Sequence, residues 1–257
     1  MKKLKKSEKS RGIIAFANNN GTTDYVSIAK KSLKLAEKTL GLPTTLISLD
    51  DLNYNNTRYD IDTEQFVEWK NYDRCLAYEL SPYDETIVID ADYLILDDSL
   101  NKIFDCSWDY LLQRENLSLT TTYPTKMGTT SLPYVWATVF AFRKTEKSKL
   151  FFDLILRIQN NYSYYKLLFN VDQRNFRNDY AFAMADIILN GYSVPVQGLA
   201  GTMITVDQVI QSITKKDNKL VIKDNTKSYV LPLTNLHVMS KLYLQSDNFL
   251  EFINELA

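Results

Sequence analysis

Two aspartates one residue apart are the most chemically suggestive feature of this sequence. The apolar run Thr86-Ile87-Val88-Ile89 is typical of a short buried strand, and it leads directly into Asp90-Ala91-Asp92. Side chains two positions apart on an extended chain lie on the same side, where two carboxylates repel each other unless a cation lies between them. A hard divalent ion such as Mg²⁺ or Mn²⁺ prefers oxygen ligands and also binds diphosphate oxygens. The spacing therefore predicts a divalent-cation site; the simpler alternative is that the acids only cap the next turn.

The first hundred residues predict a parallel sheet that would position this pair. The run Ile13-Ile14-Ala15-Phe16-Ala17 indicates a strand buried on both faces. An amphipathic helix should follow, with Asp24 as its N-cap and Gly41 as its C-cap, and then a second strand at 44–49. Such a βαβ unit favours a right-handed crossover. Since ligands gather at the carboxyl ends of the strands in open α/β sheets, Asp90 lies where a binding site is expected.

The rest of the chain completes the predicted fold. Helices are expected at 62–80, 147–162, 179–189 and 248–256, a strand at 134–142, and three short strands within 209–233. We therefore expect one α/β domain over residues 1–257. It would contain a mixed, mostly parallel sheet flanked by helices and a small C-terminal β meander.

Composition narrows the class of protein. The chain has 257 residues, 45% of them hydrophobic, and a formal net charge of -1, so any contact with nucleic acid would have to be local. No apolar run is long enough for a signal peptide or a membrane span, and we interpret the basic segment 1–11 as a flexible tail. Cys75 and Cys106 show no metal-ligand spacing, which favours a reducing compartment; we expect a cytoplasmic protein, in a bacterium or in the host of a phage.

The segment around the acidic pair carries a resemblance to a known family. Ile87-Val88-Ile89-Asp90-Ala91-Asp92-Tyr93-Leu94-Ile95-Leu96-Asp97-Asp98-Ser99-Leu100 resembles the metal-binding segment of glycosyltransferase family eight, the glycogenin-like enzymes of the Rossmann-like GT-A fold. The resemblance implies transfer of a sugar from a nucleoside-diphosphate sugar, such as a UDP-sugar, with Mn²⁺ (or Mg²⁺) as cofactor. Asp90 and Asp92 would be metal ligands, Ala91 would lie beside the donor, and Asp90 would also take part in catalysis. Residues 12–105 would form the nucleotide-sugar-binding half and 106–257 the acceptor-side half.

The same resemblance suggests further donor-binding residues. Ala15-Phe16-Ala17-Asn18, together with Tyr25, resembles the pocket for the nucleotide base. The alternative for Phe16 and Tyr25 is core packing. Arg74 falls at the distance from the acidic motif where such enzymes carry a donor-contacting basic residue; the alternative is a solvated helix face.

Three later residues complete the implied site. His237, the only histidine, would be the third metal ligand, and Lys241 would pair with the diphosphate, although its spacing from His237 is shorter than usual and the usual glycine is missing. Asp179 matches the acidic residue beside the donor sugar, and its alternative role is helix N-capping. Asp179 would act as general base if the reaction inverts configuration, or would stabilise the oxocarbenium-like centre if it retains it. The segment 134–138 occupies the family's sugar and acceptor strand but lacks its Asn and Gly pattern.

The acceptor is expected to be a hydroxyl group, on a glycan or on DNA. The segment 177–183 also resembles small GT-A proteins of tailed phages, some of which glycosylate hydroxymethylated bases in phage DNA. Five lysines of the predicted meander could contact phosphates, or could simply lie on a solvated hairpin: Lys215, Lys216, Lys219, Lys223 and Lys227.

Other functions fit parts of the pattern. A phosphatase of the haloacid dehalogenase type would use Asp90 as nucleophile and Asp92 as acid, but its motif normally lies on the first strand. A sugar nucleotidylyltransferase would want a glycine-rich loop, which Asn18-Asn19-Asn20-Gly21-Thr22 matches poorly. A nucleotide-sugar binding module without turnover is the non-enzymatic alternative.

Overall fold

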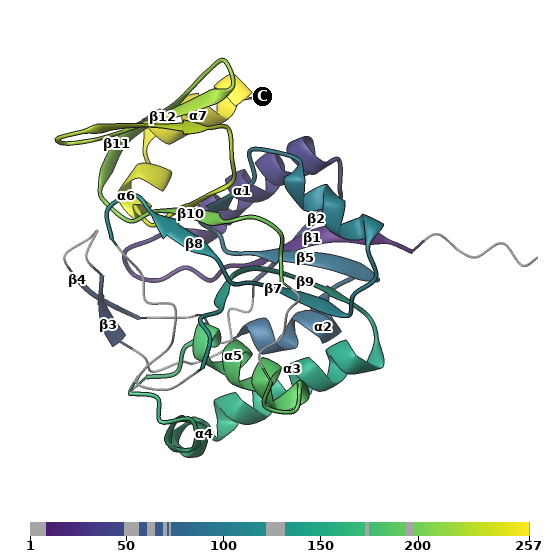
Figure 1. Ribbon diagram of the computed structural model, residues 1–257. Coiled ribbons are helices and arrows are strands. Elements are labelled where there is room, and N and C mark those ends of the chain that lie inside the picture. Colours follow the sequence, from purple (N-terminus) through teal and green to yellow (C-terminus); the bar gives the residue numbers. More distant parts are fainter. Residues whose placement is uncertain are drawn as a thin grey trace, which may run out of the picture.

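The main sheet has five strands in the order β2-β1-β5-β9-β7. The computed structural model describes residues 9–48, 57–60, 65–68, 71, 73–121, 132–172, 175–193 and 198–256. β1 is parallel to β2 and β5, whereas β9 is antiparallel to both β5 and β7. Four of the five strands therefore run in the same direction, which confirms the mixed, mostly parallel sheet (Figure 1). The strands are Arg11–Phe16 (β1), Thr44–Ile47 (β2), Glu85–Ile89 (β5), Tyr110–Gln113 (β7) and Trp136–Arg143 (β9).

The predicted βαβ unit is present, with α1 (Tyr25–Leu40) between β1 and β2. The Asp24 side chain accepts a hydrogen bond from the Ser27 N–H at 2.9 Å, which satisfies a donor that the first helical turn leaves without a partner. Gly41 ends the helix with φ 68, in the left-handed region that glycine adopts without steric cost. Both predicted caps are confirmed. The chain enters β1 at Arg11, and residues 1–8 of the predicted tail lie outside the described residues.

Helices cover both faces of this sheet. Along β1, Ile13 and Ala15 belong to the hydrophobic cluster under α1, whereas Ile14 and Phe16 belong to the cluster on the opposite face. This alternation follows from the two-residue period of a strand. The opposite face is covered by three helices (Figure 1), which are Ala77–Leu80 (α2), Glu146–Asn160 (α3) and Asn178–Leu189 (α5). The inner strands β1 and β5 are thus buried on both sides, as their continuous apolar sequences predict, whereas the edge strand β2 is half-buried.

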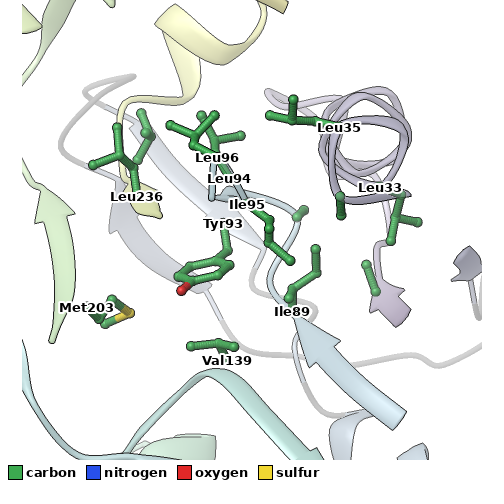
Figure 2. Packing of buried hydrophobic residues seen from close by; sticks show 14 of the residues in the cluster. Leu33, Leu35, Ile89, Tyr93, Leu94, Ile95, Leu96, Val139, Met203 and Leu236 are labelled. Carbon is green, nitrogen blue, oxygen red and sulfur yellow. The ribbon is translucent and has the colours of Figure 1, made fainter. Parts of the chain in front are cut away.

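A second, smaller sheet extends the cluster under α1. Its order is β6-β14-β10-β8, and its strands are Tyr93–Leu94 (β6), Asn116–Ser118 (β8), Met203–Val206 (β10) and Leu236–Val238 (β14). Leu94, Met203 and Leu236 from three of these strands pack in the same cluster as Leu33 of α1 and Ile89 of β5 (Figure 2). The packing fixes β6 and β14 beside the end of β5, where the acidic pair begins.

The C-terminal meander is also present. β11, β12 and β13 are antiparallel neighbours, and α7 packs against β11. The segments are Ile210–Lys216 (β11), Lys219–Asp224 (β12), Ser228–Pro232 (β13), Lys241–Leu244 (α6) and Asp247–Leu256 (α7); the remaining helical segments are Asp73–Leu76 (η1), Ser99–Asp105 (η2) and Tyr162–Leu168 (α4). Among the described helices, none has both the length and the apolar character needed to cross a membrane.

The helix predicted at 62–80 is wrong in its first part. Within that range Gln65–Glu68 form strand β4, which pairs antiparallel with β3 (Thr57–Asp60), and among the described residues the helical turns run from Asp73. Phe66 is 74% exposed, so it does not belong to the buried stripe that its spacing suggested. The backbone of this segment instead makes its hydrogen bonds to a neighbouring strand, a tertiary arrangement that helical periodicity does not reveal.

Candidate active site

The acidic pair lies in a turn at the carboxyl end of β5. The Asp90 N–H donates to the Thr138 carbonyl of β9 at 2.8 Å, and the Tyr93 N–H donates to the Asp90 carbonyl at 3.1 Å. The second bond closes a turn through Ala91 and Asp92, so the expected extended geometry is wrong. The carboxylates nevertheless converge, because the turn is followed immediately by β6.

His237 reaches the pair from β14. It lies opposite Tyr93 in the antiparallel pairing of β14 with β6, and the neighbouring Val238 N–H donates to the Asp92 carbonyl at 2.9 Å. Asp90, Asp92 and His237 each offer one ligand atom, and these atoms all lie within 4.8 Å of one another. The structure therefore brings together the three residues expected to bind metal.

The surroundings of His237 favour the tautomer in which Nε2, the ring nitrogen that faces Asp92, carries no hydrogen. The Thr205 hydroxyl donates its only hydrogen to Asn116 Oδ1 at 2.8 Å, and Thr205 Oγ1 lies 3.4 Å from His237 Nδ1. Thr205 Oγ1 can therefore accept from Nδ1–H, and in that tautomer of His237 the lone pair is on Nε2. Nε2 lies 3.6 Å from Asp92 Oδ2. Two carboxylate oxygens and this nitrogen form a donor set that fits a divalent cation.

Each aspartate also has a cationic neighbour. Lys241, the first residue of α6, pairs with Asp92, and Arg74 of η1 pairs with Asp90. Burial alone would raise the pKa of Asp92, but the charge of the Lys241 ammonium group beside it outweighs burial and holds that pKa well below its usual range. Burial lowers the pKa of Arg74 to about 10, opposed by the nearby aspartates. Arg74 is 5% exposed, so the alternative of a solvated helix face is wrong.

Asp179 does not cap α5, because the N-cap position belongs to Arg177, which makes no side-chain capping bond. Asp179 lies in the first turn, where its Oδ1 accepts the Ala137 N–H at 2.9 Å and its Oδ2 lies 3.4 Å from Arg177 Nη2. The Ala137 carbonyl accepts from Arg74 Nη1 at 2.5 Å. Asp179 and Arg74 are thus both hydrogen-bonded to Ala137 of strand β9.

An irregularity in the sheet explains why Ala137 is available for both contacts. The pairing of β7 with β9 shifts between Leu112, which faces Phe140, and Gln113, which faces Trp136. The intervening residues of β9 therefore have no partner in β7. Such bulges commonly occur beside functional sites, where they free backbone groups and redirect side chains.

These groups line a cavity of about 310 Å³. Of the residues expected around the nucleotide base, Phe16, Ala17, Asn18 and Tyr25 line it, as Ala91 also does, whereas Ala15 does not. The Ala15 side chain is fully buried in the core. Asn18 is fixed by two hydrogen bonds, one from its Nδ2 to Asp73 Oδ2 at 3.0 Å and one from Ser48 Oγ to its Oδ1 at 3.2 Å.

Sequence reasoning assigned no individual role to several cavity residues, although it placed segment 134–138 on the sugar and acceptor strand. Tyr134 and Trp136 stack with ring centroids 4.7 Å apart, and Arg177 directly precedes Asn178 and Asp179. The predicted importance of segment 134–138 and the charge beside Asp179 were signals that could have identified these three. Glu68 and Asn71 had no such signal. They reach the cavity from a segment that was expected to be helical, and Asn71 accepts a hydrogen bond from Asn178 Nδ2 at 2.6 Å.

Comparisons with known proteins give structural neighbours only. No protein-family model matches the chain, and no curated protein sequence does. Among similar solved structures is the glycosyltransferase GlyE of Streptococcus pneumoniae TIGR4, with 10% identity over 71% of this chain and a TM-score of 0.43. The match covers 44% of the GlyE chain, less than half of its length. A glycosyltransferase involved in glycosylation of the major capsid of PBCV-1 has 9% identity over 76% of this chain and 84% of its own, with a TM-score of 0.43. The galactosyltransferase LgtC, in complex with donor and acceptor sugar analogs, has 15% identity over 69% of this chain and 70% of its own, also with a TM-score of 0.43.

Proposed function

We propose that this protein is a metal-dependent glycosyltransferase of the GT-A type, which moves a sugar from a nucleoside-diphosphate sugar to a hydroxyl acceptor. The observation that carries the proposal is the convergence of Asp90, Asp92 and His237 on one cavity at the carboxyl edge of the sheet. A cavity of about 310 Å³ lies within the range of small-molecule sites. Residues 12–105 supply the nucleotide-sugar side in this proposal, and residues 106–257 supply the acceptor side.

The donor would lie along one wall of the cavity. Phe16 and Tyr25 present aromatic rings for a nucleotide base, uracil in the form we propose, and Asn18 presents a fixed amide. Asp90, Asp92 and His237 would hold Mn²⁺ or Mg²⁺ against the diphosphate, and the ion would neutralise charge on that leaving group. Lys241 and Arg74 add permanent positive charge at the same end of the cavity.

Sugar transfer breaks the bond between the anomeric carbon and the diphosphate oxygen, which leaves with the bonding pair, and forms a bond to the acceptor oxygen. The acceptor hydroxyl must give up its proton. Asp179 is the candidate group beside the sugar, either as the base that takes this proton or as a negative charge that stabilises the oxocarbenium-like centre. Its hydrogen bond to Ala137 fixes its position in both cases.

The acceptor in this proposal is a glycan or a hydroxymethylated base in phage DNA. All five meander lysines are exposed, and the pairing of the strands places Lys216, Lys219 and Lys223 on the solvent side of β11 and β12. These positions supply phosphate contacts if DNA is the acceptor. Retention on duplex DNA that falls with salt supports DNA, and retention that does not exceed that of an acidic control protein supports a glycan.

The rival functions receive less support from the site. A phosphatase would need Asp90 as a nucleophile, but Arg74 pairs with that carboxylate, and β1 and β2 precede β5 in the chain. A binding module without turnover would bind the donor but would release no nucleoside diphosphate. The cytoplasmic location stays a prediction.

The decisive experiment is a screen of nucleoside-diphosphate sugars that measures release of nucleoside diphosphate with and without Mn²⁺. We expect release with a UDP-sugar only in the presence of the metal. Asp92→Ala should abolish metal-dependent donor binding while the protein stays folded, and Asp98→Ala is the matched control, because Asp98 is an exposed acid of the same segment. Wild-type donor affinity in Asp92→Ala would refute the proposal.

A further inference from the structure

The acids of the cavity are almost completely neutralised by the protein itself. Asp90 is paired with Arg74, Asp92 with Lys241, and Asp179 with Arg177. The fourth acid lining the cavity, Glu68, is exposed on β4, and the nearby Asp73 accepts a hydrogen bond from Asn18 and does not line the cavity. With the imidazole neutral, the cluster of Asp90, Asp92, Arg74 and Lys241 has no net formal charge.

Lys241 is the neighbour that competes most directly with a metal. Its ammonium group contacts Asp92 Oδ2, the same oxygen that lies 3.6 Å from His237 Nε2. Both side chains of the Lys241–Asp92 pair are 11% exposed, so water screens the pair little. A divalent cation that arrives alone must therefore displace a buried ammonium ion from one of its ligands, which then lacks a partner for its charge.

A diphosphate removes that obstacle. Its oxygens carry negative charge into the cavity, and they can accept the ammonium of Lys241 when the metal takes Asp92. We infer that Lys241 is a resident counter-ion that makes the metal and the nucleoside diphosphate bind as one unit, each weakly without the other. This inference rests on the proposed function, because it takes the Asp90–Asp92–His237 cluster to be the metal centre.

The position of Lys241 in the chain supports this role. It is the first residue of α6, four positions after His237, and Ser240 at the N-cap is fully buried. A short connection to a helix start restricts how far the ammonium group can move. Lys241 can thus exchange Asp92 for a ligand in the adjacent cavity by a change of side-chain rotamer, without movement of the fold.

The test is a thermodynamic cycle for Mn²⁺ and UDP, measured by titration calorimetry and by the electron paramagnetic resonance signal of free Mn²⁺. In the wild-type protein we expect saturating UDP to increase Mn²⁺ affinity by about 100-fold. Lys241→Met, which removes the charge at similar length, should bind Mn²⁺ alone about tenfold more tightly than wild type and should lose most of the coupling to UDP. Lys241→Arg should behave like wild type, and Lys34→Met on α1 is the control for an exposed lysine.

Thermal stability gives a readout that is independent of turnover. Lys241→Met leaves Asp92 without its counter-ion, so its Tm should fall without ligand and recover with Mn²⁺ alone, whereas Mn²⁺ alone should change the wild-type Tm little. Lys241→Gln replaces the methionine variant if that variant does not fold. Unchanged or weaker Mn²⁺ affinity in the neutral variant, with wild type still binding Mn²⁺ in the presence of UDP, overturns this inference only. Absence of Mn²⁺ binding by wild type at every UDP concentration overturns the proposed function as well.

Discussion

The two ends of strand β5 carry acids in opposite electrostatic situations. Glu85 at its start is 2% exposed and has three cationic partners: Arg143 at 2.9 Å, Arg11 at 3.0 Å and Lys9 at 3.6 Å. Asp90, which follows its other end, has one cationic partner among the described residues, Arg74, and lines a cavity. An acid surrounded by cations is satisfied by the fold. An acid with one cationic partner and access to a cavity still has oxygen atoms that a ligand can use.

The largest difference is expected when the acid at each end of β5 is exchanged for its amide: one variant should lose activity and the other should lose stability. Asp90→Asn should lower the rate of nucleoside diphosphate release by a factor of about 1,000 or more, because the lost charge faces the reacting groups. Its Tm should change little, because the buried Arg74 keeps the charges of Asp179, Asp92 and Asp73 nearby. Glu85→Gln should lower the free energy of unfolding by about 3 kcal/mol, because it removes the buried charge that pairs with Arg143, whose side chain is only 11% exposed. Its kcat/KM should stay at the wild-type value. Denaturant unfolding and steady-state kinetics on both variants check this, and a large loss of activity in folded Glu85→Gln would break the comparison.

Asp179 is an intermediate case, because Arg177 and Arg74 lie near it and the Ala137 N–H donates to it. Asp179→Asn keeps an oxygen for the Ala137 N–H but removes the charge. We expect kcat to fall about 100-fold with little change in the KM for the donor, because the charge acts on the transfer step. The variants are compared in donor and acceptor titrations, with Asp179→Ala as the variant that also loses the hydrogen bond. A wild-type kcat in Asp179→Asn would mean that Asp179 only holds β9 in place through its hydrogen bond to Ala137.

The smallest effect is expected for a change at Thr205, which contacts the proposed metal ligand His237. Thr205→Val removes the hydroxyl that accepts from His237 Nδ1–H and changes little else in size. Loss of such an outer partner typically weakens metal binding by about tenfold. Titration of Thr205→Val and wild type with Mn²⁺ in the presence of UDP measures this change in metal affinity. Unchanged affinity would mean that the ring is oriented by its packing alone.

The sequence predicted the site best where one strand leads directly into it. Continuous apolar runs identified β1 and β5, and the acidic pair after β5 was enough to expect a cation site. His237 was expected there only through a family resemblance, because the pairing of β14 with β6 depends on contacts that are far apart in the chain. For the same reason Glu68 and Asn71 were missed, and the ion pairs of Arg74 and Lys241 with the aspartates were not foreseen. Charge pairing across the cavity depends on the assembled fold, which local periodicity does not report.

Ala137 has a consequence for how this protein should be probed by mutation. Its N–H and carbonyl are the only parts that reach Asp179 and Arg74, so a scan that replaces residues with alanine would pass over it as already scanned. The separation of the charges of Asp179 and Arg74 thus depends on the φ and ψ angles of one small residue. Replacing Ala137 with a β-branched residue or proline would shift the charges of Asp179 and Arg74 together. The variant would then behave as if both residues, which are far apart in the sequence, had been changed.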